Sequence, residues 1–260
     1  MDWNEEWNRS IRLTSRARLN AASFWDDRVR SCGPGHFPEE LTKDQIHIIR
    51  PEREQRILEI GPGVGRLTLP LARSSLEVTV VDPSVAMLNI LKERSQSEGL
   101  SNVKVHNDYW EQIDTGFLGR YDKLVSSFSL FMYDIGWQLA RMDAIADAVF
   151  LFVPADHRIP YSIQELLFGK VRVMYTDHVI LSRLTNEMGY HPDTFTIDYP
   201  NNLGFSSLEE AGDYYCDIYC APASFRGSVI ERLASSMEER SGRYYMGHSR
   251  SVGVICWQKG

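Results

Sequence analysis

Short apolar runs alternate with longer amphipathic segments between residues 56 and 153, a pattern typical of a parallel α/β sheet. Five runs have the length and composition of buried parallel strands: 57–60, 77–81, 102–106, 121–126 and 148–153. Segments of helical length separate the strands, and residues 134–147 are predicted as the fourth crossover helix. The pattern therefore predicts an α/β fold whose ligand-binding residues lie at the carboxyl ends of the strands.

The flanking segments follow other patterns. Residues 1–50 are predicted as a helical N-terminal extension, because Trp3, Trp7 and Ile11 recur at helical spacing. Beyond Pro154 the alternation stops, and an inserted, partly helical segment is expected over 154–175. Further helices are predicted at 177–188, 206–217 and 224–240, a further strand at 194–199, and strands that close the sheet at 243–245 and 252–257. The chain is thus interpreted as the extension followed by one domain, 51–260, with additions between 154 and 240.

Composition narrows the class of protein. The 260 residues suffice for one large α/β domain, and 43% of them are hydrophobic. No run has the length of a membrane helix, and the N-terminal Met-Asp-Trp-Asn-Glu-Glu-Trp lacks the basic-then-apolar order of a signal peptide. We therefore expect a cytoplasmic protein with no membrane partner. Cys216 and Cys220 could share a helix face, but no second pair has metal-site spacing, so buried free thiols are favoured.

The charge balance argues against nucleic acid as a partner. The formal net charge is −7, whereas affinity for phosphates comes from Lys and Arg. A local basic excess, Arg9, Arg12, Arg16 and Arg18, is interleaved with apolar residues. A solvated helix face above an apolar stripe is favoured over an RNA-binding patch for this segment.

The turn after the first strand carries the first chemical signal. Gly61, Gly63 and Gly65 stand at alternate positions between the strand and the next helix. Glycine lets the backbone turn sharply and approach a ligand closely. A dinucleotide-binding fingerprint needs its third glycine three residues after the second, and that position holds Arg66.

Acidic residues follow the second and third strands. Asp82 ends the second strand, where its carboxylate can accept hydrogen bonds from both hydroxyls of a ribose. Asp108 follows the third strand and precedes Tyr109 and Trp110. Each has a structural alternative: Asp82 as a helix cap, Asp108 as a turn residue and the aromatics as core. Their order at the ends of successive strands favours a ligand site.

With Glu59 before the glycines and Asp82-Pro-Ser-Val-Ala-Met-Leu88 opening the next helix, residues 55–155 resemble class I S-adenosylmethionine-dependent methyltransferases. The resemblance implies a Rossmann-like sheet, mostly parallel with an antiparallel closing hairpin, an N-terminal helical lid and inserted helices after the fifth strand. It also implies S-adenosylmethionine as the cofactor. The cofactor-binding residues expected from it are Glu59, Gly61, Pro62, Gly63, Gly65, Asp82, Pro83, Ser84, Met87, Asp108, Tyr109, Trp110 and Ser126.

The acceptor is argued by elimination among related families. The rRNA adenine dimethyltransferases share Leu-Glu-Ile-Gly-Pro-Gly-x-Gly-x-Leu-Thr, but they normally have Glu at position 82 and Asn-Leu/Ile-Pro-Tyr at 126–129, where this chain has Ser-Ser-Phe-Ser. Amino-methylating DNA enzymes carry Asn/Asp-Pro-Pro-Tyr/Phe there. Metal-dependent catechol-type enzymes have aspartate where Ser126 stands, so no metal is expected. Cytosine C5 enzymes need a Pro-Cys dipeptide, which does not occur here.

These comparisons leave an O, N, S or C nucleophile on a small molecule or on one protein side chain, and a small-molecule acceptor, methylated by in-line displacement, is favoured. The alternatives are an RNA adenine-type methyltransferase and a non-catalytic binding protein of the same fold. Acceptor-binding candidates are Trp25, Arg28, Phe131, Tyr133 and Tyr175, although the aromatic stretch 128–133 suits a core equally. Candidate bases are Asp134, His157, Tyr161 and His178, each more often structural than catalytic.

Residues 1–35 and 154–235 are expected to cover the methyl end of the cofactor and form the acceptor pocket. The alternative is that their aromatic side chains form a dimerisation surface. The identity of the acceptor, the atom methylated and the oligomeric state stay open.

Overall fold

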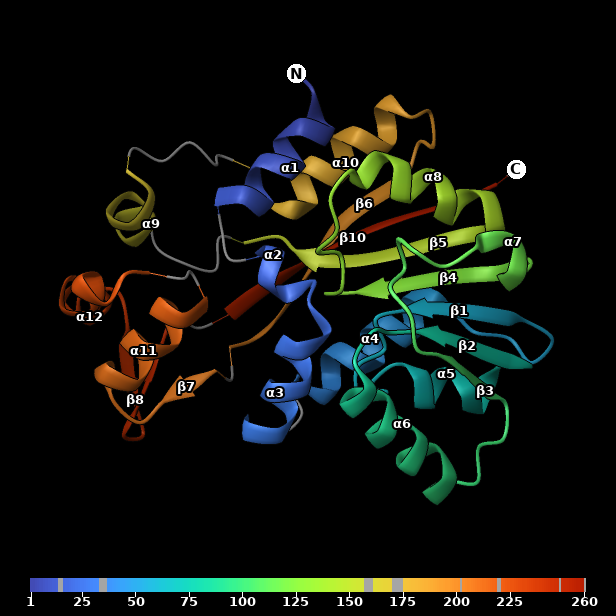
Figure 1. Ribbon diagram of the computed structural model, residues 1–260, viewed down its shortest axis with the longest axis horizontal. Coiled ribbons are helices and arrows are strands. Elements are labelled where there is room, and N and C mark those ends of the chain that lie inside the picture. The colour runs from blue at the N-terminus through green and yellow to red at the C-terminus, as the bar shows by residue number, and fades with distance from the viewer. Residues whose placement is uncertain are drawn as a thin grey trace.

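The computed structural model describes residues 1–13, 16–32, 37–156, 161–169, 175–201, 203–218, 221–247 and 249–259. A seven-stranded sheet with the order β3-β2-β1-β4-β5-β10-β6 forms its centre (Figure 1). The strands are β1 (Arg56–Ile60), β2 (Glu77–Val81), β3 (Val103–His106), β4 (Tyr121–Ser127), β5 (Ala146–Pro154), β6 (Asp193–Pro200) and β10 (Ser249–Gln258). β10 runs antiparallel to both β5 and β6, whereas the pairs from β3 to β5 are parallel. The predicted α/β class, a mostly parallel sheet with an antiparallel closing strand, is confirmed.

The strand order reverses between β1 and β4. From β1 the chain crosses to β2 and then β3 on one side, and from β4 it crosses to β5 on the other. Ile57 of β1 pairs with Lys123 of β4, and Ile57, Leu58 and Leu124 are fully buried, because helices cover both faces of the sheet. A reversal of this kind leaves a crevice outside the carboxyl ends of the two central strands, where open α/β sheets bind ligands.

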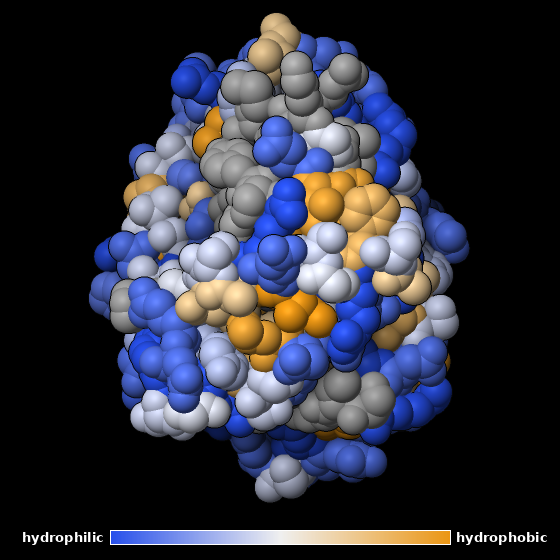
Figure 2. Space-filling view, turned by 90° about the vertical axis from the view of Figure 1, so that its left-hand side faces the viewer, coloured by the Kyte–Doolittle hydropathy of each residue, from blue (hydrophilic) through white to orange (hydrophobic). Residues whose placement is uncertain are grey.

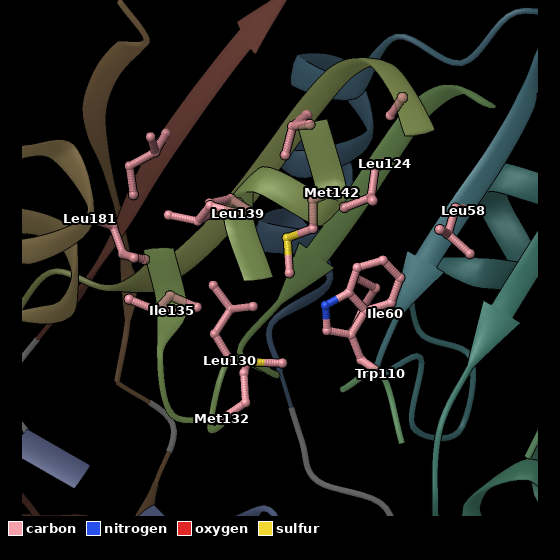
Figure 3. Packing of buried hydrophobic residues seen from close by; sticks show 14 of the residues in the cluster. Leu58, Ile60, Trp110, Leu124, Leu130, Met132, Ile135, Leu139, Met142 and Leu181 are labelled. Atoms are coloured by element: carbon pink, nitrogen blue, oxygen red, sulfur yellow. The ribbon is translucent and has the colours of Figure 1, made fainter. Parts of the chain in front are cut away.

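Helices cover the two faces of the sheet in separate layers. One face carries α4 (Glu39–Ile49), α5 (Thr68–Ser74) and α6 (Val85–Ser97), which share a core cluster with β1, β2 and β10. The other carries α1 (Trp3–Leu13), α8 (Ile135–Ile145) and α10 (Asp177–Glu187), with α7 (Thr115–Leu118) near the sheet's end. Figure 3 shows Leu139 and Met142 of α8 in the same buried cluster as Leu124 of β4. Each layer buries the apolar side of an amphipathic helix against the strands.

The N-terminal segment is helical, as predicted, and it contributes to the main core. Trp7 and Ile11 of α1 are fully buried and belong to the cluster that α8 and α10 form on the sheet. The chain continues through α2 (Arg16–Leu19) and α3 (Ala22–Cys32), which lie beyond the arrowheads of β1 and β4 in Figure 1. The described part of residues 1–50 is therefore packed on the sheet and its carboxyl edge.

The additions near the C-terminus form a smaller unit beyond that edge (left-hand side of Figure 1). It comprises α9 (Tyr161–Phe168), β7 (Gly204–Phe205), α11 (Leu208–Ile218), a 3₁₀ turn (Ala223–Phe225), α12 (Arg226–Ala234), β8 (Glu238–Arg240) and β9 (Arg243–Tyr245). Its core cluster includes Ile163, Phe205, Tyr215 and Leu233. Figure 2 shows this side of the molecule, where hydrophobic residues gather near the middle and hydrophilic ones surround them.

Two predictions for this unit are wrong. Residues 243–245 do not close the main sheet but form β9 in a small sheet with the order β7-β9-β8, and 238–240 form β8 rather than the end of a helix. The cause is the Ser241-Gly242 turn, in which φ is 52° and 74°, because two consecutive positive φ values suit a tight hairpin. The main sheet is closed instead by β10 and β6, which the inserted unit separates in sequence.

Among the described residues, no helix combines the length and the apolar character needed to span a membrane.

Truncation of Trp7 tests whether α1 is part of the domain core. The Trp7 side chain is fully buried, and its Nε1 donates a hydrogen bond of 2.8 Å to the carbonyl oxygen of Met132. We expect Trp7→Ala to lower the free energy of unfolding by about 3–5 kcal/mol, because it removes a large buried ring. Urea unfolding should show one transition at a lower midpoint. Trp3→Ala, which removes a partly buried ring, is the control and should cost less. An unchanged midpoint for Trp7→Ala would mean that α1 does not stabilise the domain.

Candidate methyltransferase site

The three glycines after β1 are each required for a different reason. All three have positive φ values: 67° at Gly61, 54° at Gly63 and 89° at Gly65. A Cβ on Gly61 would lie 2.3 Å from the Cβ of Ser129, and one on Gly65 would lie 2.3 Å from Cδ1 of Leu91 in α6. At Gly63 nothing lies within 4 Å of that position. The first and third glycines thus allow close packing of protein on protein, and the second presents bare backbone to open space.

Asp82 lies beside this open backbone. Its Oδ2 accepts a hydrogen bond of 3.2 Å from the amide of Gly63, and its Oδ1 accepts one of 2.8 Å from the amide of Ser84. Burial raises the pKa of the Asp82 carboxyl to about 6, and the nearby carboxylate of Asp26 adds to the increase, although the two amide bonds oppose it. The carboxylate is therefore held next to the glycine loop and gains from any further hydrogen-bond donor.

The loops after β2 and β3 are fastened to each other. The side-chain amide of Asn107 donates hydrogen bonds of 3.0 Å to the carbonyl oxygens of Asp82 and Pro83. Asp108 is partly exposed and accepts a hydrogen bond of 2.8 Å from the amide of Tyr109. The structure thus brings Asp82 and Asp108 to adjacent strand ends, as the sequence predicts. Pro83, Ser84 and Met87 of the predicted set occupy the turn and the first turn of α6 beside them.

Two other predicted residues, Glu59 and Ser126, are buried at the ends of the strands next to the glycine loop. Glu59 is 2% exposed, and its carboxyl group accepts a hydrogen bond of 2.6 Å from the hydroxyl of Thr68 in α5. Burial raises its pKa to about 7. Ser126 is fully buried and lies 2.8 Å, hydroxyl to hydroxyl, from Ser129, which donates to the carbonyl oxygen of Ile60. Pro62 is also buried, in the turn itself.

Trp110 does not belong with the other predicted cofactor residues. Its side chain is 3% exposed and lies in the core, close to Ile60 in Figure 3, with the guanidinium of Arg141 4.7 Å from its ring centroid. Tyr109, by contrast, is partly exposed at the strand end. The structure therefore assigns Trp110 to packing, one of the two readings that the sequence allowed.

The acceptor candidates fall into separate places. The rings of Trp25 and Phe131 face each other with centroids 6.0 Å apart, so α3 meets the loop after β4. Tyr133 follows in the same loop and is 42% exposed. Tyr175 instead contacts Trp3 and lines a pocket of about 580 Å³ between α1 and α10. Arg28 lines a second pocket of about 380 Å³, together with Phe24 of α3 and Asp217 of α11.

The described base candidates have structural partners. Asp134 lies at the N-terminus of α8, where its Oδ1 accepts a hydrogen bond of 3.0 Å from Asn8 of α1. His178 of α10 packs against Gly253 of β10, and burial lowers the pKa of its imidazole. His157 and the side chain of Tyr161 lie outside the described residues. Asp134 and His178 thus join helices to the fold.

Sequence reasoning missed three residues beside the loop. Asp26 bonds to the start of α6, and Ser129 packs on Gly61. Arg66 donates hydrogen bonds of 2.6 Å to Gln45 of α4 and 2.9 Å to Ser127 at the end of β4, and burial lowers its pKa to about 10. Arg66 stood in the motif, but its partners are distant in sequence. Asp26 lies in sequence between the acceptor candidates Trp25 and Arg28, and only the orientation of α3 in the structure shows that Asp26 is the residue that contacts α6.

Comparison with known proteins agrees with this geometry. A family model described as a methyltransferase domain matches residues 57–149, which run from β1 into β5 and include the glycine loop, Asp82 and Asp108. The chain contains a class I methyltransferase domain. Its cofactor is S-adenosylmethionine, and the open face at Gly63 together with the Asp82 carboxylate fits the adenosyl part of that molecule.

Curated relatives resemble part of the chain. The ribosomal RNA small subunit methyltransferase A of Desulforapulum autotrophicum is 36% identical over 90 residues, which are 34% of this chain and 31% of that protein. The protein of the same name from Buchnera aphidicola is 25% identical over 180 residues, 69% of this chain and 54% of that one. The chain thus spans about half the length of these relatives or less.

Solved structures resemble more of the chain at lower identity. The magnesium protoporphyrin IX methyltransferase of Synechocystis, solved with S-adenosylhomocysteine, is 13% identical with a TM-score of 0.53, over 93% of this chain and 97% of that one. A cyclopropane-fatty-acyl-phospholipid synthase-like protein of Lactobacillus casei is 17% identical with a TM-score of 0.54, over 82% and 90%. At identities this low, the structural match shows a shared fold alone.

A matched pair of glycine substitutions tests the open face of the loop. Gly63 and Gly99 both have positive φ, 54° and 69°, and neither would place a Cβ within 4 Å of another atom. We expect Gly63→Ala and Gly99→Ala to lose similar stability, about 1 kcal/mol, from backbone strain. Only Gly63→Ala should weaken binding of S-adenosylhomocysteine, by tenfold or more, because its methyl group enters the cofactor space. Calorimetric titration measures this, and equal affinities in the two variants would refute the assignment.

The raised pKa of Asp82 predicts a pH dependence of cofactor binding. Ribose hydroxyls donate to the ionised carboxylate, whereas the free protein holds the proton below about pH 6. The dissociation constant for S-adenosylhomocysteine should therefore rise as pH falls below 6, by up to tenfold per unit. Asp82→Asn should bind more weakly at pH 8 and lack this phase. An unchanged pH profile in Asp82→Asn would assign the titration elsewhere, for which Glu59, with a pKa of about 7, is the nearest alternative.

The raised pKa values of Asp82 and Glu59 also determine how the stability of the free protein changes with pH. Both carboxyl groups titrate lower in the unfolded chain, at about 3.8 for Asp82 and 4.5 for Glu59. The folded state therefore binds protons more tightly. The stability that these two groups contribute is greatest below their unfolded pKa values, and it is lost as pH rises through their folded values of about 6 and about 7. Bound cofactor should reduce the part that comes from Asp82.

Proposed function

We propose that the protein transfers the methyl group of S-adenosylmethionine to a small-molecule acceptor. The path of the loop after β4 carries this proposal. Phe128 has a φ of 58°, and a proline ring fixes φ near −65°, so this backbone does not suit the proline that the adenine-methylating families place at position 128. The ring of Phe128 stacks on Phe37 instead, with centroids 5.1 Å apart. The loop therefore differs from an adenine-binding loop in conformation as well as in sequence.

The surroundings of α3 support the same proposal. Asp26 and Asp27 lie on this helix. Two further acids lie beside the residues that precede it: Glu111 accepts a hydrogen bond from Asn20, and Asp217 of α11 pairs with Arg18. The basic residues of α1 and α2 point largely to protein partners: Arg16 contacts Asp177 at 2.6 Å. An RNA-binding rim would present unneutralised Lys and Arg to phosphates. A mixed, partly acidic rim suits a small acceptor better.

The described residues suffice for a positioning mechanism. When bound, S-adenosylmethionine supplies a methyl group that is already activated by its sulfonium. The open backbone at Gly63 and the Asp82 carboxylate would hold its adenosyl part, so that the acceptor would gain the methyl group, S-adenosylhomocysteine would remain, and any proton on the acceptor would pass to solvent when the products leave. Trp25 and Phe131 close the side between α3 and the loop after β4, which excludes water and limits the approach. Alignment of this kind supplies about 7–11 kcal/mol, so no dedicated base is required.

The loop is held firmly enough for this role. The carbonyl oxygen of Leu130 accepts a hydrogen bond of 3.0 Å from Arg16, and that of Met132 accepts one from Trp7. On the other side, Ser129 donates to the carbonyl oxygen of Ile60 at 2.6 Å. Phe131, the proposed acceptor contact, is therefore fixed between the glycine loop and the N-terminal helices.

The names of the curated relatives favour ribosomal RNA as the second candidate acceptor, and labelling separates the two. Radiolabelled S-adenosylmethionine is incubated with the protein and either a low-molecular-mass cell filtrate or undermethylated ribosomal RNA. We expect label in small products, with Gly63→Ala as the inactive control. We also expect weak retention on heparin at moderate salt, because the net charge is −7. Label in RNA but not in the filtrate would overturn the small-molecule proposal.

A further inference from the structure

Helix α3 crosses both loops that are assigned to the adenosyl group. At its start, the amide of Ala22 donates a hydrogen bond of 3.1 Å to the hydroxyl of Tyr109, after β3. One turn later, Oδ1 of Asp26 accepts a hydrogen bond of 2.6 Å from the hydroxyl of Ser84 and one of 3.0 Å from the amide of Ala86, after β2. The helix packs along α6 beyond the carboxyl edge of the sheet (Figure 1).

Ser84 connects this helix to the ribose-binding carboxylate. Its amide donates to Asp82, while its hydroxyl donates to Asp26 and accepts from the amide of Met87 at 3.2 Å. Ser84 is fully buried, so these partners exclude water from it. Ser84 therefore bonds both to α3, through Asp26, and to Asp82, the residue assigned to the cofactor ribose.

The docked position suits a carboxylate in particular. The Asp26 carboxylate lies against the N-terminus of α6, a helix of 13 residues, where free amides and the helix dipole favour negative charge. The hydrogen bond from Ser84 is the main cause that lowers the pKa of Asp26, although partial burial opposes it. The next residue, Asp27, points outward and is 80% exposed in its weak pair with Arg30. Asp26 thus contacts the start of α6, whereas its neighbour Asp27 points to solvent.

We propose that Asp26 is a latch residue that holds α3 across the adenosyl site, so that cofactor entry and product release require its bonds to Ser84 and Ala86 to break. Asp26 is a positioning residue, since it acts through α3 and Ser84. The inference goes beyond the proposed acceptor, because it concerns exchange of S-adenosylmethionine and S-adenosylhomocysteine only. It therefore holds or fails whichever acceptor is methylated.

The energetic consequence lies in rates more than in affinity. Removal of the latch destabilises the closed position of α3, whether or not the site is occupied, so both association and dissociation accelerate. Two hydrogen bonds to a carboxylate are lost, which corresponds to roughly a tenfold to hundredfold change in the opening equilibrium. A purely structural role would change the melting temperature and leave the exchange rates in place.

Stopped-flow kinetics of S-adenosylhomocysteine binding tests the latch in the full-length protein. Asp26→Ala should accelerate dissociation and association by about tenfold or more, while the equilibrium constant changes less. Asp26→Asn keeps an oxygen acceptor for both donors and should restore most of the slow exchange. Asp27→Ala is the control, and its rates should equal those of the wild type.

A double-mutant cycle with Ser84 identifies the contact. If Asp26 acts through the Ser84 hydroxyl, Asp26→Ala should accelerate dissociation much less in a Ser84→Ala background than in the wild type. Equal dissociation rates in the wild type and Asp26→Ala would overturn the proposal, as would an acceleration in Asp27→Ala of the same size. If Asp26→Ala does not fold, the Ser84→Ala rate decides: faster exchange supports the latch, and wild-type exchange would be the contradicting result.

Discussion

The close approach of the loop after β4 to the glycine turn after β1 determines much of the site. Gly61 has no Cβ, and the Cβ of Ser129 lies 2.3 Å from where one would stand. Because Ser129 can come this near, its hydroxyl reaches the carbonyl oxygen of Ile60 at 2.6 Å. The next residues, 130–133, then leave the sheet in the direction of α1 and α2. A side chain at position 61 would separate the two central strand ends and displace that loop.

Helices α1 and α2 are bonded to this loop, and α1 shares the main core with it. Trp7 reaches the carbonyl oxygen of Met132, and Arg16 reaches that of Leu130. Carbonyl groups at a strand end need donors when helices bury them, and a strand edge alone does not provide them. The N-terminal segment meets that need and, through α3, extends over the loops after β2 and β3. Lid and core are thus one continuous structure in this protein.

The sequence predicted the sheet well because strand, turn and helix signals agreed there. Three of the five strands from 57 to 153 have a Gly, Asp or Pro directly after the apolar run, namely Gly61, Asp82 and Pro154, and Asp82 and Asp108 were predicted from their positions at strand ends. Trp110 and Tyr109 are neighbours with the same type of side chain, and only the tertiary path decides which one enters the core. The same limit applies to α3, whose docked face is determined by Ser84 of α6, 58 residues away from Asp26.

The latch and the raised pKa of Asp82 have one physical origin. Two carboxylates converge on Ser84, and each is stabilised by amides at the start of α6. Burial raises the free energy of the ionised Asp82, and the charge of Asp26 on α3 raises it further. Ribose hydroxyls would supply the donors that Asp82 lacks, so ligand binding relieves the repulsion that lid closure creates. Ribose binding would therefore favour the ionised form of Asp82.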